Sequence, residues 1–321
     1  MKAITLYEYG TPDVLNFEEV EKPVPKAGEV LVKVHAAAAN AADIHLMHGT
    51  PFLVRLMLGG LRKPNYHILG SDISGRVEAV GANVTQWKVG DEVFGASNLG
   101  GFAEYVCAKA DLLVSKPAAL TFEQAAGVPM AAFTALQALR DQGKLQAGQK
   151  VLINGASGGV GTFAVQIAKL LGAEVTAVCS TRNLDLVRTL GADHVIDYTQ
   201  TNFTQNGQQY DVILAANGYH PIAAYKRALR PNGIYVMVGG TNPQLFEALL
   251  LGPLMSIGSS KQMKVTSAKS NKADLLYLRD LLEARQLRPI IDQCYPLQDG
   301  AQAMRYLDAG HARGKVILQM G

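Results

Sequence analysis

The sequence predicts an α/β protein in which a β-rich domain accompanies a doubly wound parallel sheet. Three observations predict this class. Residues 1–115 cluster β-forming residues between Gly, Pro and Asp, as in a compact antiparallel barrel. From residue 150 onward, short apolar strands alternate with helical patterns, and parallel neighbours need such long crossovers. Between the first of these strands and its helix lies a glycine-rich run, residues 155–161, of the kind that binds phosphate.

The two ends of the chain share one pattern. The N-terminal part is expected to form five strands and then a helical stretch that is kinked or broken at Pro129, because proline lacks the N–H that a helix interior uses. The tail is expected to form helix, strand, helix and strand. In chain order these elements are Ala3–Tyr7, Glu29–Ala37, Ser74–Val80, Glu92–Gly95, Ala103–Val106, Leu120–Asp141, Asp274–Ala284, Pro289–Tyr295, Gly300–Ala309 and Lys315–Gln319. We expect the tail to pack back onto the first part, so that residues 1–123 and 268–321 form one domain and residues 124–267 an inserted second one.

The inserted region is predicted to form the parallel sheet. Its five expected strands are Val151–Asn154, Val175–Cys179, His194–Asp197, Asp211–Ala215 and Ile234–Val238, and its helices lie near 160–171, 182–190, 221–229 and 243–251. Ligands on such a sheet bind beyond the carboxyl ends of the strands, where the strand order reverses. The glycine run and the turn Val238-Gly239-Gly240 both follow strands at that edge.

The glycine run is the candidate phosphate site. A strand, a turn and a helix in this order aim backbone N–H groups and the positive end of a helix dipole at one point. Gly158 would let the backbone approach a pyrophosphate, and Gly161 would let the helix pack closely on the strand. Ala156 replaces the first glycine of the usual dinucleotide fingerprint, so the alternative of a tight turn without a ligand stays open.

The end of the second strand of this region indicates which nucleotide binds. An NAD-type site has an acid there that accepts hydrogen bonds from the ribose hydroxyls. Here the chain continues as Ser180-Thr181-Arg182, without an acid. Small hydroxyl groups and an arginine suit a 2′-phosphate, so NADP(H) is favoured over NAD(H). The alternative is that Arg182 is a solvated residue of the first helical turn.

Composition narrows the class further. The chain has 321 residues, 48% of them hydrophobic and 18% charged, with a formal net charge of +3, so charge alone does not indicate a nucleic-acid partner. The three cysteines are far apart and match no metal spacing, which fits a reducing compartment. No apolar stretch is long enough to span a bilayer, and no leader segment is visible, so we expect a cytoplasmic protein.

Motifs along the whole chain together resemble one family. They are Met1-Lys2-Ala3, Asn40 to Asp43, Gly70-Ser71-Asp72, Gly90 to Gly95, Ala156 to Gly161, Leu190-Gly191-Ala192-Asp193 and Gly314-Lys315-Val316. The chain is similar to the zinc-independent quinone oxidoreductases of the medium-chain dehydrogenase/reductase superfamily. Within this ζ-crystallin-like group it most resembles the chloroplast-envelope quinone oxidoreductase homologues and the reticulon-4-interacting proteins. The resemblance implies a GroES-like β-barrel catalytic domain, a Rossmann cofactor domain, a cleft between them for the nicotinamide, and a homodimer.

The resemblance also assigns cofactor contacts. The loop Ala156, Ser157, Gly158, Gly159, Val160, Gly161 would hold the pyrophosphate. Around the adenosine phosphate it implies Ser180, Arg182 and Tyr198, and toward the nicotinamide Asn217, Val238, Gly239 and Gly240. For Tyr198 the alternative is an ordinary aromatic residue at the sheet edge.

No metal site is expected. Zinc dehydrogenases of the superfamily hold zinc with Cys and His, but here Asn40 and Ser71 stand at two of those positions and Asp72 at that of a glutamate. His45 and His48 could share a helix face, yet no cysteine accompanies them. A site without zinc lacks the Lewis acid that stabilises an alkoxide, which argues against alcohol oxidation.

The chemistry that the resemblance implies is hydride transfer from NADPH to a quinone or an α,β-unsaturated carbonyl compound. Charge then develops on the acceptor oxygen, and a hydrogen-bond donor there favours the reaction. Asn40 is one candidate, with a purely structural role as its alternative. His45 stands where relatives have a pocket tyrosine and could donate a hydrogen bond or a proton, unless it is only a loop residue. Asp43 is expected to be a turn or cap acid.

Two rival functions remain. One is an enoyl-thioester reductase, and the other is a non-catalytic NADPH-binding or RNA-binding protein, although no basic surface with interspersed aromatic residues is visible. The apolar stretch Thr50–Leu61 either borders the substrate pocket, where it would admit a long chain, or forms a packed helix.

Overall fold

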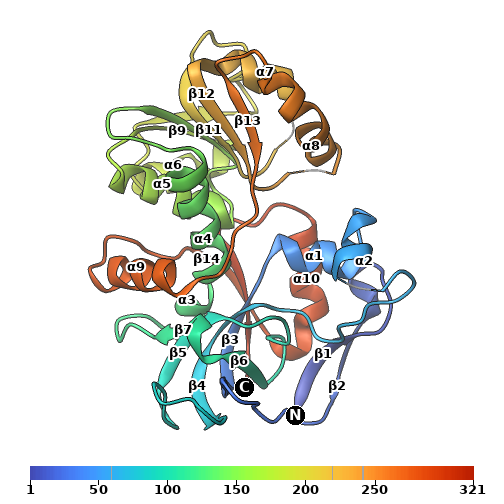
Figure 1. Ribbon diagram of the computed structural model, residues 1–321. Coiled ribbons are helices and arrows are strands. Elements are labelled where there is room, and N and C mark those ends of the chain that lie inside the picture. The colour runs from blue at the N-terminus through green and yellow to red at the C-terminus, as the bar shows by residue number, and fades with distance from the viewer. Residues whose placement is uncertain (59, 219, 241) are drawn as a thin grey trace. The chain divides into compact units, whose positions relative to one another are not determined.

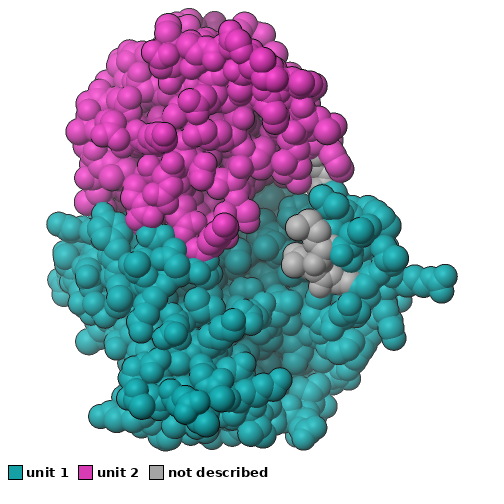
Figure 2. Space-filling model, in the orientation of Figure 1, with its two compact units in different colours: residues 1–131, 270–321 teal, residues 132–269 magenta. Residues whose placement is uncertain are grey.

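Two units make up the chain, each with its own sheet. The computed structural model describes every residue except 59, 219 and 241. Figure 2 colours the two units: unit 1 comprises Met1–Ala131 and Ser270–Gly321, and unit 2 comprises Ala132–Lys269. The first of these divisions falls inside helix α4 (Pro129–Gln137), eight residues later than the expected change at 123/124. The second falls two residues after the expected change at 267/268.

Unit 2 contains the doubly wound parallel sheet (Figure 1). Its six strands, in spatial order β10-β9-β8-β11-β12-β13, all run parallel. Their bounds are β8 Lys150–Asn154, β9 Glu174–Cys179, β10 His194–Asp197, β11 Tyr210–Ala215, β12 Leu229–Met237 and β13 Gln262–Val265. The five strands expected from the sequence are confirmed. The edge strand β13 was missed because its four residues mix polar and apolar side chains.

Helices cover both faces of this sheet. They are α5 Gly159–Leu170, α6 Leu184–Thr189, α7 Ile222–Ala228 and α8 Asn242–Ser256, with a 3₁₀ turn η4 at Thr181–Asn183. In α5 the apolar residues fall at helical spacing, and its inner side chains, such as Phe163 and Ile167, are buried. Right-handed crossovers place α5 and α6 on one face and α7 and α8 on the other, as Figure 1 shows. The strand order reverses between β8 and β11, which are neighbours in the sheet.

Unit 1 contains a mainly antiparallel sheet. Its spatial order is β14-β15-β3-β4-β5-β7, and β6 also pairs with β3. The bounds are β3 Glu29–Ala39, β4 Asp72–Val80, β5 Glu92–Ala96, β6 Tyr105–Lys109, β7 Leu113–Ser115, β14 Ile291–Pro296 and β15 Lys315–Gln319, and β1 Lys2–Leu6 forms a separate pair with β2 Leu15–Glu19. Strand β15 pairs with β3, so the tail packs on the N-terminal part as expected. Apolar residues that alternate along these strands build the core of the unit.

The helices of unit 1 are short. They are α1 Ala41–His48, α2 Leu53–Leu58, α3 Phe122–Ala126, α9 Lys272–Glu283 and α10 Gly300–Asp308, with 3₁₀ turns η1 Pro12–Val14, η2 Ala110–Leu112 and η5 Leu297–Asp299. At Pro129 the structure has a break, because α3 ends at Ala126 and α4 begins at Pro129. A short π-helix η3, Ala138–Gln142, follows α4. Within residues 50–61 only Leu53–Leu58 is helical, and Phe52, Leu53 and Leu56 are exposed. Among the described residues, no helix combines the length and apolar character needed to cross a membrane.

Candidate functional site

The glycine loop follows β8 and leads directly into α5, as the sequence predicts. Gly155 has a φ of +83°, a left-handed conformation that favours glycine. The backbone N–H groups of Gly155 and Ala156 both donate to the carbonyl oxygen of Val178 on β9, at 3.2 and 3.0 Å. Gly158 caps α5. The first N–H groups of a helix have no partner within it, so those of α5 are aimed at the space beyond the loop.

Two glycines of this loop serve different purposes. A Cβ atom added to Gly161 would lie 2.1 Å from the carbonyl oxygen of Gly155, so only glycine lets α5 pack this closely on the loop. A Cβ atom added to Gly158 would lie 3.5 Å from the same oxygen, which is an ordinary contact. The protein itself therefore has room for a side chain at Gly158.

The loops that follow β11 and β12 lie at the same edge of the sheet. Because all six strands are parallel, their carboxyl ends meet there, and β8 and β11 flank the point where the strand order reverses. The N–H of Asn217 donates to the carbonyl oxygen of Asn154 at 3.2 Å, and a Cβ atom at Gly155 would lie 2.7 Å from the nitrogen of Asn217. Asn217 therefore lies directly against the glycine loop.

The turn after β12 is equally constrained. The N–H groups of Val238 and Gly239 donate to the carbonyl oxygen of Ala215 on β11, at 3.0 and 3.3 Å. A Cβ atom at Gly239 would lie 2.5 Å from the carbonyl oxygen of Ala216, and Gly240 has a φ of +138°. The structure thus brings the turn at residues 238–240 beside the end of β11.

The residues expected around the adenosine phosphate lie at the ends of β9 and β10. Ser180 follows β9, Arg182 is exposed in η4, and Tyr198 follows β10 with 57% of its surface exposed. A carboxylate that the sequence pattern did not indicate also lies here, because Asp197 on β10 accepts a hydrogen bond from the Thr181 hydroxyl. Hydrogen bonds from Thr181 and Thr199 hold the pKa of Asp197 below its usual range, so the group is ionised.

A buried polar cluster lies next to the loops that follow β8 and β11. The side-chain amide of Asn154, at the end of β8, donates to the Tyr225 hydroxyl at 2.8 Å. Gln244 on α8 donates to the Tyr235 hydroxyl at 3.3 Å. Burial raises the pKa of Tyr225 to about 12, so its hydroxyl keeps its proton and can donate in turn. The sequence hints only at Asn154, as a polar residue that ends an apolar strand.

In unit 1, Asn40 is the single residue between β3 and α1, and it is 7% exposed. Its two side-chain hydrogens are donated to the carbonyl oxygen of Ala38 at 3.2 Å and to Asp72 at 3.1 Å. Its side-chain oxygen accepts a hydrogen bond from the ammonium group of Lys315 on β15. Both donors of this amide are therefore used within the protein.

Asp43, Asp72 and Lys315 surround Asn40 and are buried, with exposures of 2%, 0% and 3%. Burial raises the pKa of each carboxyl group to about 6. The opposing effect comes from backbone N–H groups at Asp43 and first from the Lys315 charge at Asp72. Burial also lowers the pKa of the Lys315 ammonium, while the two carboxylates act in the other direction. The expectation that Asp43 caps a helix is confirmed, because it accepts the N–H of Asn40 at 2.8 Å.

His45 lies on helix α1 and not on a loop. It shares that helix with His48, whose ring nitrogen lies 2.9 Å from Asp308. Nδ1 of His45 lies 3.0 Å from the carbonyl oxygen of Thr50. Because a carbonyl only accepts, Nδ1 carries the hydrogen and the other ring nitrogen, Nε2, has none in the neutral ring.

The described residues contain no group of three or more His, Cys, Asp and Glu side chains arranged to hold a metal ion. Where zinc dehydrogenases of the superfamily would hold their metal, the structure has the Lys315 ammonium 3.8 Å from Asp72. An ammonium beside the carboxylate repels a divalent cation. Of Asn40, Ser71 and Asp72, only the Asp72 carboxylate is an ordinary zinc ligand, and one ligand is fewer than a zinc site needs.

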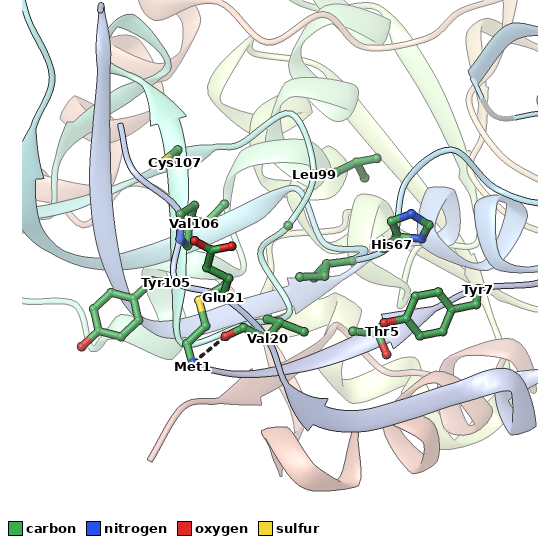
Figure 3. A pocket seen from close by; sticks show the side chains of 13 residues that line it. Met1, Thr5, Tyr7, Val20, Glu21, His67, Leu99, Tyr105, Val106 and Cys107 are labelled. Carbon is green, nitrogen blue, oxygen red and sulfur yellow. Dashed lines mark hydrogen bonds between the residues drawn. The ribbon is translucent and has the colours of Figure 1, made fainter. Parts of the chain in front are cut away.

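A separate cavity of about 500 Å³ lies in unit 1 beside β1 and β6 (Figure 3). Tyr7 and His67 line one end and Glu21 and Tyr105 the other, as Figure 3 shows. Burial raises the pKa of the Cys107 thiol in its wall to about 11, so this cysteine is not a reactive thiolate. None of the residues predicted to bind cofactor or substrate lines this cavity.

Two family models match the chain. The model described as an alcohol dehydrogenase GroES-like domain matches residues 26–118, within unit 1. The model described as a zinc-binding dehydrogenase matches residues 190–318, which extends from the third strand of the parallel sheet into the tail. The second match therefore covers parts of both units.

Whole-length relatives are also similar. The chain is 34% identical to a chloroplastic quinone-oxidoreductase homolog of Spinacia oleracea, over 99% of this chain and 98% of the relative. It is 33% identical to a chloroplastic NADPH-dependent alkenal/one oxidoreductase of Arabidopsis thaliana, over 99% and 79%. A solved quinone oxidoreductase from Coxiella burnetii superimposes with a TM-score of 0.88 at 31% identity and 99% coverage of both chains. The chain therefore belongs to the quinone oxidoreductase group of the medium-chain dehydrogenase/reductase superfamily, with its GroES-like and Rossmann domains.

Proposed function

We propose that the chain is an NADPH-dependent reductase that transfers a hydride to quinones or α,β-unsaturated carbonyl compounds. The observation that carries the proposal is a glycine loop that leads into a helix at the point where the strand order of the parallel sheet reverses. The names of the relatives, quinone oxidoreductase and alkenal/one oxidoreductase, support the class of acceptor.

In this proposal, unit 2 holds the cofactor, which when bound supplies the hydride. The N–H groups at the start of α5 and the loop Ala156–Gly161 bind the pyrophosphate, because Gly158 leaves room for it. Ser180, Arg182 and Tyr198 surround the adenosine phosphate. Asn217 and the turn at residues 238–240 orient the nicotinamide half.

We propose NADPH over NADH because no acid follows β9 and Arg182 can pair with a 2′-phosphate. Asp197 acts against this preference, since an ionised carboxylate near the same place repels phosphate. The hydroxyls of Thr181 and Thr199 donate hydrogen bonds to the Asp197 carboxylate oxygens and so reduce this repulsion. We therefore expect a preference for NADPH and weaker use of NADH.

For unit 1 we propose different roles for the two residues named from the sequence. His45, when protonated, would donate from Nε2 to the oxygen of the acceptor and could supply the proton that completes the reduction. Asn40 would act through its neighbours, because both its side-chain hydrogens are already donated to Ala38 and Asp72. It fixes the Lys315 ammonium at a place where superfamily relatives with zinc carry a cation.

We also propose that the protein works without zinc, as a homodimer, in the cytoplasm. The donor set at Asn40, Ser71 and Asp72 and the ammonium of Lys315 support the first point. The three cysteines, all within the described residues, are free thiols, as in a reducing compartment. The family resemblance supports the dimer.

Purified protein mixed with NADPH and a panel of quinones, alkenals and acyl thioesters tests the function. We expect loss of the absorbance of the reduced nicotinamide with quinones or alkenals, and the same rate after dialysis against a chelator that leaves no zinc by elemental analysis. A strict requirement for an acyl thioester would identify an enoyl-thioester reductase instead. Absence of turnover with every acceptor, or activity that returns only with added zinc, would contradict the proposal.

A further inference from the structure

Asn183 is a buried residue of unit 2 to which no motif of the sequence assigns a role. It ends the turn η4, precedes α6 and is 4% exposed. Its side-chain nitrogen Nδ2 donates to the hydroxyl of Ser157 at 2.9 Å and to the hydroxyl of Ser180 at 3.2 Å. Ser157 belongs to the glycine loop after β8, whereas Ser180 follows β9. One amide therefore joins the two segments that we assign to the pyrophosphate and to the adenosine phosphate.

The direction of these hydrogen bonds determines what the serines can do. A side-chain N–H only donates, so the oxygen of each serine hydroxyl is an acceptor toward Asn183. The hydrogen of each hydroxyl must then point away from Asn183. Phosphate oxygens are strong acceptors, and a hydroxyl that is already an acceptor on its other side is a better donor to them.

The opposite orientation of the amide is less favourable. It would let both serines donate to the amide oxygen, but the NH₂ group would then occupy the place where Oδ1 now lies. Oδ1 of Asn183 is buried and has no hydrogen-bond partner among the described residues. An NH₂ group at that buried place would need two acceptors, whereas the oxygen needs one donor, and each buried group without a partner costs about 1–3 kcal/mol.

The unpaired oxygen itself is enclosed by the protein and offers no contact to a ligand. Asn183 can therefore act on a ligand only through the two serine hydroxyls, which belong to half-buried residues. Phosphate oxygens are the matching acceptors for two such donors.

We propose that Asn183 is a positioning residue that turns the hydroxyls of Ser157 and Ser180 into a pair of donors to the phosphates of the adenosine half of the cofactor. The inference rests on the proposed function and adds to it the origin of part of the discrimination between NADPH and NADH. Ser157 acts on the pyrophosphate, which both nucleotides carry. Ser180 acts on the 2′-phosphate, which only NADPH carries.

Titration calorimetry of the full chain with NADPH and with NADH tests this inference, using Asn183→Ala, Asn183→Asp and the matched control Asn202→Ala. Asn202 is an exposed asparagine of unit 2 whose side-chain oxygen accepts hydrogen bonds from nearby Thr204. We expect Asn183→Ala to weaken NADPH binding about tenfold and NADH binding less, and Asn202→Ala to change neither. Asn183→Asp should weaken NADPH binding more than Asn183→Ala, because a carboxylate only accepts and turns both hydroxyl hydrogens inward.

A purely structural role predicts the reverse order of affinities, because binding would then follow stability. Aspartate is a good residue at the start of a helix, so Asn183→Asp should unfold at a higher temperature than Asn183→Ala. The positioning role predicts that Asn183→Asp, although more stable, binds NADPH more weakly.

Variants of the two serines separate the pyrophosphate site from the 2′-phosphate site. In a Ser157→Ala background, Asn183→Ala should still weaken NADPH binding but spare NADH, whereas in a Ser180→Ala background it should weaken both equally.

The possible failures are distinguishable. If the wild-type protein binds neither nucleotide, the proposed function is wrong and this inference falls with it. If the wild type binds NADPH and both Asn183 variants bind it within twofold of the wild type, only the positioning role is overturned. The positioning role is likewise overturned if the affinities of the two variants rank in the same order as their unfolding temperatures.

Discussion

Single residues of unit 1 decide how the protein responds to pH. Asp43 accepts hydrogen bonds from the backbone N–H groups of Asn40 and Gly70, at 2.8 and 3.0 Å, yet it is 2% exposed. The loss of hydration outweighs these two bonds and raises its pKa to about 6. In the unfolded chain an aspartate has a pKa of about 3.9. Between these two values, the folded protein binds the extra proton and the unfolded chain does not.

The contribution of Asp43 to the free energy of unfolding is therefore expected to fall as the pH rises from about 4 to about 6. The folded state binds more protons in this window, so raising the pH favours unfolding, by at most about 1.4 kcal/mol per pH unit. Denaturant unfolding of the wild type and of Asp43→Asn at several pH values measures this contribution. The difference between the two should change across the window and be constant above it. A constant difference at every pH would show that Asp43 ionises in the folded protein as easily as in water.

The sequence predicted part of this arrangement. Asp43 three residues after Asn40 is the spacing of a helix cap, and a local pattern of this kind can be recognised in a chain. Its second contact, with Gly70, joins residues 27 positions apart, and the ammonium of Lys315 comes from strand β15 at the other end of the chain. No local pattern indicates such partners. The sequence therefore suggested Asn40 as a hydrogen-bond donor, whereas the structure shows its donors already used.

At the scale of elements, the junction of β8 and α5 makes a prediction with a built-in control. Gly158→Ala places a methyl group where the structure has an ordinary contact of 3.5 Å, so the variant should fold with an unfolding temperature close to that of the wild type. It should lose NADPH affinity by tenfold or more, because the methyl group occupies the space proposed for the pyrophosphate. Thermal unfolding and titration with NADPH measure the two effects.

Gly161→Ala is the matched comparison. Its methyl group would lie 2.1 Å from the carbonyl oxygen of Gly155, so α5 must move, and the unfolding temperature should fall clearly. A Gly158→Ala variant that binds NADPH like the wild type would remove the main support for the proposed cofactor site. A Gly161→Ala variant as stable as the wild type would contradict the packing described for α5.

The same scale shows where elements could be predicted. The five strands with continuous apolar runs in unit 2 were confirmed, because a buried parallel strand must be apolar on both faces. Strands β2, β7 and β13 were missed. In β2 only Leu15 and Glu18 are partly buried, and β13 lies at a sheet edge. Strands with little burial have weak patterns, since burial is what selects apolar residues. Strand β7 is buried at Leu113 and Val114 but has only three residues, too few to show an alternation.

For the whole molecule, the proposal places all cofactor contacts in unit 2. Binding stabilises the part that binds, by about 2.7 kcal/mol when the ligand is at one hundred times its dissociation constant. Hydrogen exchange of the full chain with and without NADPH should therefore show slower exchange in peptides from residues 150–183, 194–200 and 210–240. The variant Gly158→Ala should show no such change. Slower exchange confined to the cavity beside β1 and β6 would indicate a different binding site.

By itself, the sequence determined the class of fold, the family and the glycine loop at the end of β8. Each of these depends on neighbouring residues, on the alternation of apolar and polar side chains and on motifs that a linear pattern can show. Only the tertiary structure decided which polar groups are paired: Asn183 with Ser157 and Ser180, Asp197 with Thr181, and Asn40 with Lys315. Except for Asn183 and Ser180, which are three residues apart, these partners come from separate elements of the chain. Which hydrogen atoms remain available to a ligand depends on all the partners of each group.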